Sequence, residues 1–300
     1  MMWIPITIFA ALAQTGRNAA QRNLVAELGT LGATLVRFLY GLPFAVAWLL
    51  VVMGFTALPV PAMGGEFYAW AFVGGVSQIG GTALLLRTMA ERNFAVGVAY
   101  SKTEVVQVAL FSVVLLGDTL NLQGALAVGC GTLGVLLLAP ANRERPFRSL
   151  IEGFTSRSAL LGVGCGACMA LGSVAFRGAT HAVQSPSFLL NAAATLVVSQ
   201  SLQTFLLGGW LWMRDRPVVL RTFAAWRPSL FAGLMGAAAS VGWFTAFALK
   251  PVTYVRTLGL IEMVFSYVVS RRFFREQLSR REIMAIVLLA LGVVLITTAG

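Results

Sequence analysis

Charged residues are scarce in this chain of 300 residues, since Asp, Glu, Lys and Arg together make up 11% of it. Soluble domains carry about 25% charged residues, so the composition excludes an ordinary soluble protein. A single His and three Cys are too few for a disulfide framework. Apolar residues instead make up 58% of the chain, and its mean hydropathy is +0.83. These values predict a protein that crosses a membrane several times.

Ten windows of the sequence are apolar enough to cross a bilayer as helices, each close to the ~20 residues that this requires. The windows are residues 3–20, 30–53, 67–89, 95–116, 122–139, 159–176, 187–211, 229–249, 252–273 and 283–298. Their uniform apolarity excludes transmembrane strands, in which lipid-facing and lumen-facing residues alternate. The predicted fold class is therefore all-α, a polytopic membrane protein with ten transmembrane helices.

The formal net charge of +11 reflects where the arginines lie. Sixteen of the 22 basic residues fall in the loops after the odd-numbered spans, and two fall in the loops on the other side. The positive-inside rule then places the arginine-rich loops in the cytoplasm and both termini outside it, in a bacterial inner (plasma) membrane. No loop interleaves aromatic and basic residues as a nucleic-acid platform does. We therefore expect membrane lipids, and no nucleic acid, beside these loops.

A polar connector at residues 141–155 separates five predicted spans in residues 1–140 from five in residues 156–300. An offset of 158 residues superimposes Glu104 on Glu262 and gives nine identities in the 46 positions from Phe94 to Ala139. Because each half has an odd number of spans, the second copy is inverted. Inverted repeats are typical of transporters, with the substrate site near mid-membrane between the copies. One chain then contains both copies, so a monomer is expected to form the whole pathway.

The segment LGDTLNLQGALAVGCGTLGVLLL, residues 116–138, has an acidic residue followed by Leu, a polar pair and a glycine-bearing span. It resembles the end of an EamA-type repeat of the drug/metabolite transporter superfamily. Arg37 also lies where such repeats often carry an arginine, and the second half has equivalents at Glu276 and Gly292. The resemblance implies a ten-helix carrier of small metabolites, often an exporter, that works by alternating access.

Ionisable residues within the spans mark the candidate site, because a charge near the bilayer centre is costly unless it is paired or hydrated. Glu104 and Glu262 either bind a coupling proton or cation, or anchor substrate, or are structural carboxylates neutralised by their surroundings. On a continuous helix Lys102 points away from Glu104, so it extends to the membrane surface, contacts another helix or lines the cavity. Arg37 enters from the cytoplasmic side and is a hypothetical partner of Glu104. Arg256 is expected to extend to the exterior surface.

Uncharged residues complete the predicted cavity wall, although polar residues in spans also form hydrogen bonds between helices. On span 4 the i+4 and i+3 spacing places Tyr100, Glu104 and Gln107 on one face. The other candidate wall residues lie on spans 1, 3 and 8 and are Gln14, Asn18, Gln78 and Trp243.

The sequence therefore predicts a secondary transporter, and specifically an exporter, of small metabolites such as amino acids or related carboxylate-bearing compounds. Basic residues within the spans outnumber acidic ones by four to two, which favours an anionic group on the substrate. The alternative is a flippase for a lipid or a lipid-linked headgroup. With one His and no nucleophile–base arrangement, an enzyme has no support. No cofactor or metal is expected, because Cys165 and Cys168 form their CxxC pattern inside an apolar span.

Overall fold

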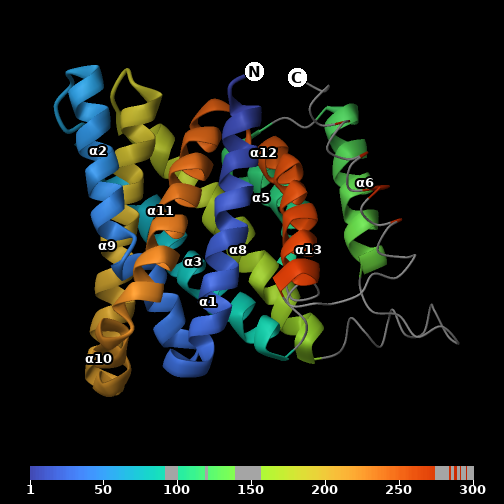
Figure 1. Cartoon of the computed structure of the whole chain (residues 1–300). Helices are drawn as coiled ribbons and strands as arrows, with labels where there is room; N and C mark the ends of the chain where they lie inside the picture. Colours follow the sequence, from blue (N-terminus) through green and yellow to red (C-terminus); the bar gives the residue numbers. More distant parts are fainter. Residues whose placement is uncertain are drawn as a thin grey trace, which may run out of the picture.

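The structure is a computed structural model that describes residues 1–91, 101–118, 121–138 and 157–273, together with five single residues between 284 and 295. Almost all of the described chain is helical (Figure 1). Its elements are α1 (Trp3–Leu39), α2 (Leu42–Thr56), β1 (Ala62–Met63), α3 (Gly65–Glu91), α5 (Glu104–Leu116), α6 (Leu122–Leu138), α8 (Arg157–Ala182), β2 (Val183–Gln184), α9 (Phe188–Arg214), α10 (Arg216–Ala224), α11 (Trp226–Leu249), α12 (Val252–Leu258), the 3-10 turn η1 (Gly259–Ile261) and α13 (Glu262–Phe273).

Helix α1 reverses direction at Gly29, where φ is 68° and ψ is 173°. This positive φ is a conformation that glycine adopts without steric penalty. Gln21 donates a hydrogen bond to the carbonyl of Ala33 at 2.7 Å, although residues 12 apart in a straight helix are separated by about 18 Å. The first two predicted spans are therefore two antiparallel arms joined at one glycine.

Six stretches of the described residues are long and apolar enough to cross a membrane. They are Trp3–Thr56, Gly65–Ala90, Leu160–Ala182, Phe188–Arg214, Trp226–Leu249 and Val252–Val269. The first of these contains the reversal at Gly29, and α5 is apolar but has only 13 residues. The prediction of a helical membrane protein is confirmed. The count of ten helices and the inverted repeats stay predictions, and the last predicted span falls largely outside the described residues.

The protein exposes large apolar side chains and buries several charged ones, which distinguishes it from a soluble protein. Large apolar side chains on the outer faces of the helices are exposed, among them Phe55 at 88% and Phe205 at 76%. Arg17 and Glu262, by contrast, are 1% and 0% exposed. A bilayer is the solvent that stabilises such a surface, since apolar side chains gain nothing from contact with water.

The main helix interfaces join the first part of the chain to the second. Helix α1 packs most extensively on α11, α3 on α8, and α2 on α9. A Cβ at Gly242 of α11 would lie 2.7 Å from the Cβ of Ala10, so α1 and α11 approach very closely there. The two-residue strands β1 and β2 also pair antiparallel across the two parts. Any site in the centre therefore draws residues from both parts of the chain.

Two segments depart from the predicted spans. The span predicted at residues 252–273 is interrupted, because the turn η1 separates α12 from α13. The polar connection after α9 contains the helix α10, whose Val218 and Val219 are buried. In Figure 1, α10 lies at the end of the bundle opposite the N-terminus.

Candidate functional site

The centre of the bundle contains a buried polar cluster around Glu262, the first residue of α13. Oxygen Oε1 of this carboxylate accepts a hydrogen bond from Nδ2 of Asn18 at 2.9 Å. Oxygen Oε2 accepts one from Nε2 of Gln14 at 2.7 Å and another from the ammonium group of Lys102. Helix α1 thus supplies two amides, and the segment before α5 supplies a cation. These contacts offset the free-energy cost of burying the Glu262 carboxylate, which has no exposure to solvent.

Lys102 and Arg256 link this carboxylate to a second one, Glu104. The Lys102 ammonium lies 3.8 Å from Oε1 of Glu104, and the Arg256 guanidinium lies 3.5 Å from the same oxygen. Arg256 also donates to the hydroxyl of Ser173 from Nε at 2.9 Å and from Nη2 at 2.6 Å. The cluster therefore alternates two cations with two anions, and Lys102 touches both anions.

The two glutamates occupy the same place in the local fold. Glu104 begins α5 directly after the turn at Lys102 and Thr103, and Glu262 begins α13 directly after η1. Each carboxylate thus directly follows a short segment that is not α-helical, although the N–H of Glu262 still donates to the carbonyl of Gly259.

Close packing at glycines fixes the positions of these groups. A Cβ at Gly166 of α8 would lie 2.6 Å from the Thr103 hydroxyl and 2.9 Å from the Glu104 backbone nitrogen. A Cβ at Gly259 would lie 2.7 Å from the ring of Trp243. Only a residue without a side chain allows these approaches. The start of α5 therefore lies directly against α8, and the Trp243 indole lies directly against η1.

The Trp243 indole forms one wall of the cluster. Its Nε1 donates to Oε1 of Gln14 at 2.8 Å, and its ring lies 4.5 Å from the centre of the Arg256 guanidinium. Phe247 stands beside it, at 6.1 Å between ring centroids. A guanidinium over an indole face gains a cation–π attraction. The aromatic wall thus orients both Arg256 and Gln14.

The structure brings together six of the residues selected from the sequence: Gln14, Asn18, Lys102, Glu104, Trp243 and Glu262. Gln107 instead faces α8 and donates to the carbonyl of Val163 at 3.5 Å. Gln78 accepts from Gln203 of α9 at 2.7 Å, in a contact between helices. Tyr100 lies outside the described residues.

Three sequence-based expectations differ from the observed contacts. Lys102 does reach Glu104, because the helix is interrupted between them and the spacing of a continuous helix does not apply. Arg37 donates to the Thr82 hydroxyl at 2.8 Å, while Glu104 pairs with Lys102 and Arg256. Arg256 is 7% exposed and turns inward, so it does not extend to the surface.

Sequence reasoning also passed over Arg17 and Ser173. Arg17 of α1 donates to Oδ1 of Asn18 from Nε at 3.2 Å and from Nη2 at 2.6 Å. Its position one helical turn after Gln14 is a signal that was present in the sequence. The contact of Ser173 with Arg256 joins residues 83 apart and follows only from the tertiary fold.

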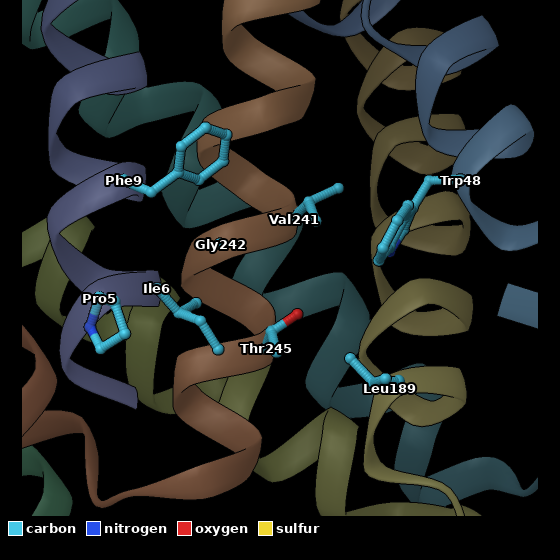
Figure 2. A pocket seen from close by; sticks show the side chains of 8 residues that line it. All are labelled: Pro5, Ile6, Phe9, Trp48, Leu189, Val241, Gly242 and Thr245. Carbon is cyan, nitrogen blue, oxygen red and sulfur yellow. The ribbon is translucent and has the colours of Figure 1, made fainter. Parts of the chain in front are cut away.

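An apolar groove lies outside this cluster, between α1 and α11 on one side and α2 and α9 on the other (Figure 2). Its volume is about 350 Å³. Figure 2 shows Phe9 and Trp48 on its opposite sides and Thr245 as its polar side chain. Gly242, which lines the groove, also packs closely against Ala10 of α1.

Comparison with known proteins gives the family. Residues 156–298 match the EamA-like transporter family. The second half of the chain belongs to this family. The EamA-like match confirms the superfamily predicted from the first half, the drug/metabolite transporters, and it makes the protein a membrane transporter of small solutes.

The likeness in fold extends over the whole chain. One crystal structure of a protein aligns with 100% of this chain and 97% of its own, with a TM-score of 0.68 and 17% identity. At that identity the likeness shows a shared fold alone. No curated protein matches the sequence.

Proposed function

We propose that this protein is a secondary transporter that exports small carboxylate-bearing metabolites, such as amino acids, by alternating access. The observation that supports this is the buried cluster in which Lys102 lies between Glu104 and Glu262. A buried ammonium group that contacts two carboxylates can give up one of them to another anion and keep the second contact. The cluster also draws on α1, α5, α11 and α13, which come from both parts of the chain.

A solute carboxylate would displace Glu262 from Lys102. Glu262 would keep its amide contacts to Gln14 and Asn18. When the solute leaves on the other side, the ion pair of Glu262 with Lys102 forms again.

The proposed orientation has both termini outside the cytoplasm of a bacterial inner membrane, as the arginine distribution predicts. In support, α10 with its arginines lies at the end opposite the N-terminus (Figure 1). The proposed inverted repeat is supported by the equivalent positions of Glu104 and Glu262. Glu104 is the first residue of α5, and Glu262 directly follows η1. Export is the direction that the family resemblance favours.

Transport by purified protein in vesicles tests this proposal. Vesicles preloaded with a labelled amino-acid panel should release at least one member faster with wild-type protein than without it. Lys102→Met should reduce that release at least about tenfold, because the solute carboxylate loses its cation. Lys250→Met is the matched control, since Lys250 is the other lysine of the chain and lies outside the cluster, 5.1 Å from the ring of Tyr254.

Glu104→Gln should also reduce release, with Glu66→Gln as its control, because Glu66 is an exposed carboxylate in the first turn of α3. Equal release by Lys102→Met and wild-type protein contradicts the proposed site. The failure of every panel member to move contradicts the proposed substrate class.

A flippase for a lipid or lipid-linked headgroup is the second candidate, and the groove between Phe9 and Trp48 supports it (Figure 2). An acyl chain fits the apolar lining of this groove, but the charged side chains that would handle a headgroup are not among the residues that line it. Labelled lipid that crosses the bilayer in the same vesicles, with no movement of small solutes, would favour this candidate.

A further inference from the structure

Two buried arginines lie beside the cluster, and in the part of the chain that the structure describes neither contacts a carboxylate directly. Arg17 and Arg37 are 1% and 2% exposed. Their hydrogen bonds go to neutral groups, the Asn18 amide oxygen and the Thr82 hydroxyl. Among the described residues, neither guanidinium forms an ion pair with a carboxylate. Buried cations without a counter-ion are strongly unfavourable, so their presence calls for an explanation.

Each of the two guanidinium groups also has a buried N–H without a partner among the described residues. On Arg17 it is Nη1, and on Arg37 it is Nε. A guanidinium offers five N–H groups in a planar fork that fits the oxygens of a carboxylate or a phosphate. The unused donors are those that such an oxyanion would occupy.

One glycine of α11 brings the two side chains together. The position of a Cβ on Gly236 lies 3.3 Å from Cγ of Arg37 and 3.4 Å from Cδ of Arg17. The two stems therefore lie on the same small patch of α11, and their like charges repel each other. An anion between the two guanidinium groups would remove this repulsion.

This arginine pair is connected to the cluster through Asn18. Its Oδ1 accepts from Arg17, and its Nδ2 donates to Glu262. In the cluster, Lys102 and Arg256 balance the two glutamates, so among the described residues Arg17 and Arg37 leave a surplus of two positive charges. A solute with two negative charges matches this surplus.

We propose that Arg17 and Arg37 form a second anion subsite and that the transported solute carries two anionic groups. Its chemical class is a small dicarboxylate or a phosphate ester. One oxyanion binds at Lys102, as in the proposed function on which this inference rests, and the other binds between the two arginines.

Ligand-dependent thermal stability of the purified protein tests the subsite. The probes are succinate, butyrate as its monocarboxylate match, glycerol phosphate, and chloride at equal ionic strength. For wild-type protein, succinate or glycerol phosphate should have a Kd at least about tenfold below that of butyrate. The stronger of the two identifies the second group as a carboxylate or as a phosphate.

In Arg37→Gln and in Arg17→Gln, the dianion should bind with the same Kd as butyrate. In Arg221→Gln, which changes an exposed residue of α10, the dianion should still bind more tightly than butyrate. The ligand-free variants should also melt at the same temperature as wild-type protein or higher, because each lacks a buried charge that repels its neighbour. A merely structural arginine would instead leave the variant less stable and the preference intact.

Three outcomes overturn the proposal. They are equal affinity of wild-type protein for butyrate and the dianions, stabilisation by chloride as large as that by the dianions, and preference retained in both arginine variants. If butyrate binds and depends on Lys102 while the dianions show no advantage, the proposed function stands and the second subsite does not.

Discussion

At the scale of single residues, Lys102 determines the charge balance of the buried cluster. It contacts Glu104 and Glu262, and it is 4% exposed. Lys102→Met should destabilise the protein by about 3–5 kcal/mol, since Glu262 is left buried without its cation. Adding Glu262→Gln should recover part of this loss because it removes the orphaned charge. Denaturant unfolding of the two variants in detergent measures the difference.

The double variant is the control for this prediction. If Lys102→Met and Lys102→Met/Glu262→Gln unfold at the same denaturant concentration, the two residues are not energetically coupled in the folded protein.

At the scale of secondary-structure elements, Gly166 sets the distance between α8 and α5. Gly166→Ala would place its Cβ within 3 Å of both Thr103 and the Glu104 nitrogen, so α5 must move and the protein should lose about 1–3 kcal/mol. Gly164→Ala is the matched control on the same helix, because its nearest neighbour is a Leu84 methyl at 3.6 Å. Thermal unfolding should rank Gly164→Ala at or above wild-type protein and Gly166→Ala below it; the reverse order contradicts the packing argument.

At the scale of the whole molecule, Arg177 joins three parts of the chain. Its Nη1 donates to the carbonyls of Phe247 at 2.5 Å and Lys250 at 2.8 Å, and its Nε lies 3.6 Å from Asp118. These contacts cap the end of α11 and tie it to α8 and to Asp118, which lies two residues after α5. Arg177→Gln should therefore loosen the last turn of α11, since two carbonyls lose a charged donor.

Hydrogen–deuterium exchange measures this effect directly. Amides in the last turn of α11 should exchange faster in Arg177→Gln, while those of α2 and α9 should not change. Arg271→Gln, which removes an exposed charge from α13, is the control. Unchanged exchange at the end of α11 would show that Arg177 is not needed to hold this end of the helix.

Much of the architecture and part of the site were predictable from the sequence. Long apolar runs with few charges leave a chain no option but helices in a bilayer, and the cost of burying charge marks Lys102, Glu104 and Glu262 as functional candidates. The i+4 spacing of Gln14 and Asn18 correctly indicated one shared helix face. These inferences depend on local periodicity and composition, which the sequence contains in full.

The partners of these residues were decided only by the tertiary structure. Whether Glu104 meets Arg37 or Arg256 depends on breaks in helices and on glycine contacts such as Gly259 against Trp243, which set depth and rotation. Periodicity defines a face of one helix, but it does not say which other helix packs on that face. The sequence by itself therefore determined a membrane protein with scarce, buried charges, and the packing of α1, α5, α11 and α13 determined which of those charges meet.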